Sequence, residues 1–218
     1  MPRTRIAGRS VVRGSVALLA LFAGLLSSSA PVQAGHGVFC FGLHVPQQFT
    51  GGSGNDVING TSGSDVMHGR GGNDEVNGQG GNDFICGGDG NDTLRGQAGD
   101  DAINGEAGQD RLEGWGGNDS IYGQADPDTA WGSTATDFFD CGNGDDTLFG
   151  EDGADNIHGF NNQDQLYGHD GIDDLLGLDG DDVLRGGNDT DQLDGGAGID
   201  DCIAAPPTND DSDNQECP

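Results

Sequence analysis

Aspartate recurs at every ninth residue over most of the chain, and a series of carboxylates this regular is suited to binding metal ions. The series keeps one register from its first member to its last. Its members are Asp56, Asp65, Asp74, Asp83, Asp92, Asp101, Asp110, Asp119, Asp128, Asp137, Asp146, Asp155, Asp164, Asp173, Asp182, Asp191 and Asp200. Because a strict repeat of this kind is typical of solenoid proteins, we expect the aspartates to be stacked along the molecule.

Each nine-residue unit contains the elements that would position its aspartate, which stands sixth. The first unit runs from Gly51 to Asn59 and the last from Gly195 to Ile203. Glycine opens sixteen of the seventeen units, with Cys141 as the exception, and holds the fourth position in thirteen. Glycines at these two positions can supply the positive φ angles of a tight turn, and the last three residues can form a short strand. One unit is therefore predicted to be a turn followed by a strand.

The eighth position of every unit is small or apolar, which predicts one inward side chain per strand. These residues are Ile58, Met67, Val76, Ile85, Leu94, Ile103, Leu112, Ile121, Ala130, Phe139, Leu148, Ile157, Leu166, Leu175, Leu184, Leu193 and Cys202. A single unit cannot bury its apolar residue, so successive units must coil and stack into a continuous core. If strands alternate between two faces, one coil takes two units, or eighteen residues.

In such a coil, equivalent aspartates lie above one another at the strand spacing of about 4.8 Å. At an effective dielectric constant near 20, two bare carboxylates that close would repel each other by roughly 3 kcal/mol. A divalent cation between them removes this repulsion. Calcium suits the site best, because it accepts six to eight oxygen ligands in flexible geometry and glycine-rich turns offer backbone carbonyls beside the carboxylates.

The repeat resembles the G-G-x-G-x-D-x-U-x nonapeptide of RTX, or hemolysin-type, calcium-binding proteins, as the unit from Gly87 to Arg95 illustrates. The resemblance covers residues 51–203. It implies an all-β fold, a parallel β-roll or right-handed β-solenoid of about 17 units with two units per coil. It also implies that the sixth-position aspartates bind several calcium ions together with nearby backbone carbonyls. The alternative is a solenoid whose aspartates only solvate its turns.

The net charge of the chain agrees with multiple calcium ions. The formal charge is −30 at pH 7, and residues 1–34 hold four arginines and no acid. Without those residues, four arginines face 38 acidic residues, a net charge of −34. Ions between equivalent units would number up to about 15 and would nearly cancel this charge. Because the chain is acidic and poor in apolar residues, we expect it to be disordered without metal and to fold when calcium binds.

The N-terminal residues predict export. Four arginines, an apolar run from Val16 to Leu26 and small residues ending at Ala34 are typical of a secretory signal peptide over residues 1–34, cleaved before Gly35. A membrane anchor is the alternative, although the run is short for a bilayer. We therefore expect a secreted or cell-surface protein without a transmembrane segment after cleavage. Many RTX proteins instead carry an uncleaved C-terminal export signal, which the short acidic tail does not resemble.

Short segments flank the repeats. Residues 35–50 are expected to cap the roll and include a degenerate repeat, in which Phe49 holds the eighth position and Gln47 replaces the aspartate. Residues 204–218 are expected to form an acidic C-terminal tail or cap.

Five cysteines remain after cleavage, and export makes disulfides plausible. Cys86 and Cys141 are about 3.5 coils apart, near 17 Å, which is too far for a bridge. The pairings we predict are Cys40 with Cys86 and Cys202 with Cys217, which leave Cys141 free or available for intermolecular pairing. A zinc site is the alternative, but the chain has no CxxC motif.

Outward residues at the ninth position predict a second feature. Trp131, Phe149 and Tyr167 recur every eighteen residues and are followed by Arg185. They would form an aromatic column about 10 Å long that ends in a cation. The column could bind an extracellular glycan or protein partner, or it could be a cross-strand ladder that stabilises the sheet.

The sequence gives little support for catalysis. Ser133 lies in no G-x-S-x-G motif, the histidines form no HExxH motif, and a core of one side chain per unit leaves no room for a pocket. Nucleic acid is an improbable partner, since an acidic surface repels phosphate. We therefore predict a non-catalytic calcium-binding module that serves a structural or binding role. The alternatives are an accessory domain for an exported RTX enzyme and a cell-surface adhesin.

Overall fold

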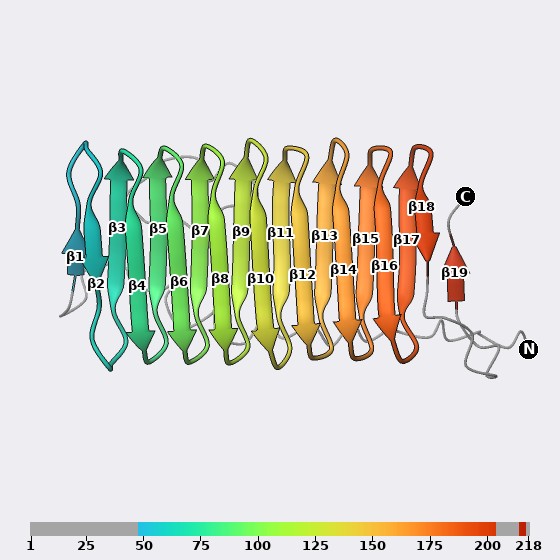
Figure 1. Ribbon diagram of the computed structural model, residues 1–218, viewed down its shortest axis with the longest axis horizontal. Coiled ribbons are helices and arrows are strands. Elements are labelled where there is room, and N and C mark those ends of the chain that lie inside the picture. The colour runs from blue at the N-terminus through green and yellow to red at the C-terminus, as the bar shows by residue number, and fades with distance from the viewer. Residues whose placement is uncertain (1–47, 204–213, 217–218) are drawn as a thin grey trace, which may run out of the picture. The chain divides into compact units, whose positions relative to one another are not determined.

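The computed structural model describes residues 48–203 and 214–216, and these residues form two parallel β-sheets. In Figure 1 all strands of one sheet point up and all strands of the other point down. One sheet contains ten odd-numbered strands: β1 (Gln48–Thr50), β3 (Val66–Gly71), β5 (Phe84–Asp89), β7 (Ala102–Ala107), β9 (Ser120–Ala125), β11 (Phe138–Asn143), β13 (Asn156–Asn161), β15 (Asp174–Asp179), β17 (Gln192–Ala197) and β19 (Asn214–Glu216). The other contains nine even-numbered strands: β2 (Val57–Asn59), β4 (Glu75–Gly80), β6 (Thr93–Ala98), β8 (Arg111–Gly116), β10 (Thr129–Thr134), β12 (Thr147–Asp152), β14 (Gln165–Asp170), β16 (Val183–Asn188) and β18 (Asp201–Ile203).

Consecutive strands alternate between the two sheets, so each coil contains two repeat units. From β1 to β18, paired residues within a sheet are eighteen positions apart, as Leu94 and Leu112 are, or Ile103 and Ile121. The last strand, β19, pairs with β17 at an offset of twenty-two residues, as Leu193 does with Gln215. The predicted all-β parallel roll with an eighteen-residue coil is confirmed.

The strands are longer than predicted. Most have six residues instead of three, because each continues through the first three residues of the next unit. In β6, for example, Leu94 and Gly96 are the two buried inward positions. The glycine that opens each unit therefore belongs to the strand rather than to the turn.

The opening glycine is required by lack of space. A Cβ atom on Gly96 would lie 2.2 Å from Oδ2 of Asp101, the sixth-position aspartate of the same unit. The prediction that both recurring glycines supply positive φ angles is thus correct only at the fourth position, for eight of its thirteen glycines. There Gly99 has φ of 128°, and Asp126 and Ala135 take 73° and 82° in units that lack the glycine. The irregular units around residues 123–141 consequently keep the strand register of the others.

The core is a double file of eighth-position side chains between the sheets. All of these residues from Met67 to Leu193 are at most 1% exposed, and Phe49 and Cys202 pack against the two ends of the file. Burying a leucine, isoleucine or phenylalanine contributes about 1.5–3 kcal/mol, and most half coils supply one such residue. Because the file fills the space between the sheets, the stability of the roll depends on many equivalent contacts between neighbouring coils.

The structure describes only a small part of the two predicted caps. Phe49 in β1 pairs with Met67 in β3, as expected for the eighth position of a degenerate repeat. The predicted signal peptide, Gln47 and most of the acidic tail lie outside the described residues. Within residues 48–203 and 214–216, no helix is long and apolar enough to cross a membrane.

Candidate metal centre

The sixth-position aspartates form two columns, one along each edge of the roll. They lie in the turns between strands, so the columns follow the two rows of loops at the top and bottom of Figure 1. One column contains Asp56, Asp74, Asp92, Asp110, Asp128, Asp146, Asp164, Asp182 and Asp200, and the other Asp65, Asp83, Asp101, Asp119, Asp137, Asp155, Asp173 and Asp191. The structure therefore brings together the predicted metal ligands, including Asp128 and Asp137 in the irregular units.

Hydrogen bonds join the aspartates along each column. The backbone N–H of Asp92 donates to Oδ1 of Asp110 at 2.8 Å, and that of Asp110 donates to Oδ1 of Asp128 at 2.8 Å. The other column repeats this contact, with 2.8 Å from the N–H of Asp101 to Oδ1 of Asp119. Each aspartate thus uses one carboxylate oxygen to hold the turn of the preceding coil.

The second carboxylate oxygen has a different environment. Oδ2 of Asp110, Asp119, Asp128 and Asp146 is buried and has no hydrogen-bond partner among the described residues. The aspartates themselves are at most 3% exposed. A buried anionic oxygen without a partner costs several kcal/mol. The same uncompensated oxygen recurs along both columns, which is the arrangement expected of sites that require a cation.

Burial also shifts the acidity of these groups. Burial raises the pKa of Asp110 and of Asp119 to about 7. The hydrogen bond that each carboxylate accepts from a backbone N–H lowers the pKa, but by less than burial raises it. The pKa of Asp128 rises to about 9 for the same main reason, with further repulsion from Asp110 and Asp146 in its column. The metal-free columns therefore resist full ionisation at neutral pH, and a bound cation would remove this resistance.

The donor set matches a hard, oxygen-binding ion. Among the described residues, no three histidine, cysteine, aspartate or glutamate side chains are grouped as a metal site. Backbone oxygens lie close to the carboxylates. Beside Gly78, for example, Oδ2 of Asp83 and the carbonyl oxygen of Gly96 in the next coil face the same point, because a Cβ atom on Gly78 would lie 2.3 Å from the first and 2.6 Å from the second. Calcium accepts mixed carboxylate and carbonyl ligands, whereas zinc prefers nitrogen and sulfur.

A comparison with protein families agrees with this geometry. Residues 50–85, 87–121, 116–148, 140–175 and 167–202 match the RTX calcium-binding nonapeptide repeat. The chain belongs to this family. The repeats of this RTX protein are accordingly calcium-binding repeats, as predicted. A search of curated proteins found no match to the chain.

A further set of turn residues supports the RTX columns and was not predicted. Side chains at the fifth position accept hydrogen bonds from the next coil: Oδ1 of Asn55 from the N–H of Asn73 at 2.9 Å, and Oδ1 of Asn73 from that of Asn91 at 3.2 Å. The fifth-position side chain thus accepts a hydrogen bond from the following coil, and the sixth-position aspartate accepts one from the preceding coil. The sequence signal was the frequent asparagine immediately before the aspartate.

The predicted aromatic column is present on the outer face of the even-numbered sheet. The rings of Trp131 and Phe149 stack with centroids 5.5 Å apart, and those of Phe149 and Tyr167 with centroids 5.0 Å apart. Arg111 lies 4.0 Å from the Trp131 ring, and Arg185 forms an ion pair of 2.7 Å with Asp201. The stacked rings cover one another's faces and so form a cross-strand ladder, while their role toward a partner stays a prediction.

The cysteine predictions are tested in part. Cys141 is buried and is the free cysteine within the described residues. Cys86 and Cys202 are not free thiols. Their predicted partners, Cys40 and Cys217, lie outside the described residues, so both pairings stay predictions.

Proposed function

We propose that this RTX protein is a secreted, non-catalytic module whose roll folds when calcium binds, and that it serves a structural or binding role outside the cell. The observation that carries the proposal is the pair of aspartate columns, in which buried Oδ2 atoms recur without a partner in the described residues. A chain with this arrangement and a formal charge of −30 is poorly suited to fold alone.

Bound calcium would supply positive charge and accept the carboxylate and carbonyl oxygens of neighbouring coils. The sixth-position aspartates would hold the ions through Oδ2 and the turns through Oδ1, so that binding and coil stacking depend on the same residues. Up to about 15 ions could be held between equivalent units, because each ion would lie between two successive coils. Calcium-coupled folding follows, since the binding site does not exist in an unstacked chain.

Export before folding would suit such a module. A chain that lacks order without calcium could cross a membrane unfolded and fold in calcium-rich surroundings. The basic and apolar residues within positions 1–34 support this route.

The buried thiol of Cys141 offers a direct test of folding. Its side chain is fully buried in the roll, and an alkylating reagent can reach it only when the coils separate. Under non-reducing conditions, we expect Cys141 to be protected in calcium and to react rapidly in excess EDTA. Magnesium in place of calcium serves as the control and should give little protection. Equal protection of Cys141 in calcium and in EDTA would contradict the proposal.

A further inference from the structure

Trp115 differs from the aromatic residues of the ladder, because its ring is available to solvent. It is 52% exposed and is the only aromatic among the exposed large apolar residues of the described chain. Trp131, Phe149 and Tyr167 cover one another's faces, but within the described residues no ring stacks on Trp115. A partner that packs against an aromatic face on this sheet would therefore find it at Trp115.

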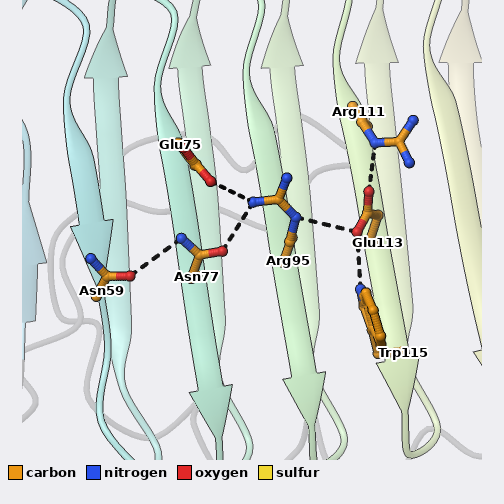
Figure 2. Close-up of polar contacts among 7 residues, drawn as sticks. All are labelled: Asn59, Glu75, Asn77, Arg95, Arg111, Glu113 and Trp115. Atoms are coloured by element: carbon orange, nitrogen blue, oxygen red, sulfur yellow. Dashed lines mark hydrogen bonds and ion pairs between the residues drawn. The ribbon is translucent and has the colours of Figure 1, made fainter.

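Polar contacts hold Trp115 in place. Its indole Nε1–H donates to Oε2 of Glu113 at 3.0 Å, and Nε of Arg111 donates to Oε1 of the same carboxylate at 2.5 Å. Arg95 reaches Glu113 from the neighbouring strand β6 at 3.3 Å. Figure 2 shows Arg111, Glu113 and Trp115 in line along β8, with the Arg95 side chain between β6 and β8. Burial raises the pKa of Glu113, but the hydrogen bonds from Trp115 and Arg111 and the charges of Arg111 and Arg95 outweigh it and bring the pKa below its usual value, so the carboxylate stays anionic.

The fold does not require tryptophan at this position. Trp115 is the second residue of its unit, where φ is 81°, and Gln79, Gln97 and Gln124 take φ of 78°, 81° and 84° at the same position of other units. Glutamine thus satisfies the backbone as well as tryptophan does. A large, exposed and pre-positioned ring that the fold does not need indicates binding.

The neighbouring strands leave space beside the ring. Trp115 in β8 pairs with Ser133 in β10, which pairs in turn with Glu151 in β12. Strands β8 and β12 are about 9.6 Å apart at the usual strand spacing, and only the small serine stands between them. A ring of sugar thickness therefore has room beside the indole, and Glu151 holds the next place in the same row, two strands from Trp115.

The chemistry of this surface favours a sugar over a protein. A pyranose has one face of C–H groups that packs on an indole, and a rim of hydroxyl groups that can bond to a carboxylate such as that of Glu151. Stable protein interfaces bury about 800 Å² per partner around several apolar anchors, and this part of the sheet offers a single exposed aromatic anchor. We propose that Trp115, Ser133 and Glu151 form a binding site for a pyranose ring of a neutral glycan.

The two tryptophans of the chain allow a direct experiment. In calcium, nitrogen-15 NMR spectra show one indole N–H signal from Trp115 and one from Trp131, and the Trp115→Gln variant identifies them. Cellohexaose, maltohexaose and chitohexaose are titrated separately as probes. We expect at least one of them to shift the Trp115 signal strongly and the Trp131 signal weakly.

Variants at equivalent positions then separate binding from folding. Trp115→Gln should raise the dissociation constant of that probe about tenfold or more, because the stacking contact is lost. Phe160→Gln is the matched control: Phe160 is also the second residue of its unit, has φ of 83° and lies in the other sheet at β13. It should leave the dissociation constant unchanged.

Three outcomes would overturn the proposal: no shift with any of the three probes, a larger shift at Trp131 than at Trp115, or unchanged affinity in Trp115→Gln. Circular dichroism on each sample establishes that the roll is folded. The site requires the folded roll but no particular number of calcium ions, so its failure would leave the calcium-binding proposal intact.

Discussion

Replacing Asp146 by asparagine should have opposite effects on the calcium-loaded and the metal-free roll. Asp146 is fully buried in the middle of its column, between Asp128 and Asp164. Asp145, immediately before it, is exposed and provides a control with the same change of charge. The comparison separates the loss of a metal ligand from a general reduction in negative charge.

In calcium, the Asp146→Asn variant should be less stable than the wild type. An ion present at one hundred times its dissociation constant stabilises the folded state by about 2.7 kcal/mol. Because Asp146 has a neighbour above and below in its column, the substitution affects up to two ions and should lower the free energy of unfolding by about 3–5 kcal/mol. Asp145→Asn should change it by less than about 0.5 kcal/mol.

Without calcium at neutral pH, the sign should reverse. Burial raises the pKa of Asp146 from 3.8 to about 7, so the folded state binds this proton more tightly than the unfolded state does. Stability is therefore lost as pH rises above about 4, and the loss reaches about 4 kcal/mol by pH 7. Asparagine removes this penalty and can still accept the N–H of Asp128, which donates at 2.7 Å. Its buried amide costs about 1–3 kcal/mol, so a net gain of about 1–3 kcal/mol remains at pH 7 and vanishes near pH 5.

Two assays measure these effects. Urea unfolding followed by far-ultraviolet dichroism gives stability in calcium, and folding driven by trimethylamine N-oxide gives it in EDTA. The reasoning would be refuted if Asp146→Asn and Asp145→Asn were equally stable in calcium. It would also be refuted if Asp146→Asn needed more of the osmolyte than the wild type at pH 7 in EDTA.

Two further predictions concern pH and the opening glycine. Burial raises the pKa values of Asp137 and Asp155 to about 8 and about 6, so acidification from about pH 8 to about pH 5 should increase the strand signal of the metal-free protein. Because protons compete with calcium, it should also raise the calcium concentration needed for half-maximal folding. Dichroism that is independent of pH in EDTA would oppose this prediction. Gly114→Ala should lower stability in calcium by about 1–3 kcal/mol, because its Cβ would lie 2.3 Å from Oδ2 of Asp119. Gly116→Ala, whose Cβ would meet nothing closer than 3.6 Å, should melt like the wild type, and equal melting of both variants would be evidence against the steric role of the opening glycine.

The sequence predicts the repeat architecture well because one period determines both register and core. Aspartate and apolar residues keep fixed positions in each unit, so Leu94 had to lie beside Leu112 once the coil length was known. The same period places the aspartates in columns and stacks Trp131 on Phe149. These features depend on spacing alone.

Features that depend on backbone conformation were less predictable. The second position takes positive φ with residues such as Gln97 and Trp115, which do not favour it, so stacking of the coils determines the backbone there. The sequence predicts Gly96 to be a turn residue. In the structure, glycine is required there because a Cβ atom would collide with the Asp101 side chain. The hydrogen bond from each aspartate N–H to the carboxylate of the next coil was likewise not predictable. It depends on how the turns of two successive coils are positioned relative to each other, and the spacing of residues in the sequence does not determine this.

The central claim, that the aspartate columns need bound calcium to coexist in a folded roll, can be tested on one sample. Native mass spectrometry counts the ions while far-ultraviolet dichroism follows the strands during a calcium titration from EDTA. We expect the strand signal and the number of bound ions to increase together, toward up to about 15 ions. A monomer with full strand signal and no bound metal at neutral pH would contradict it.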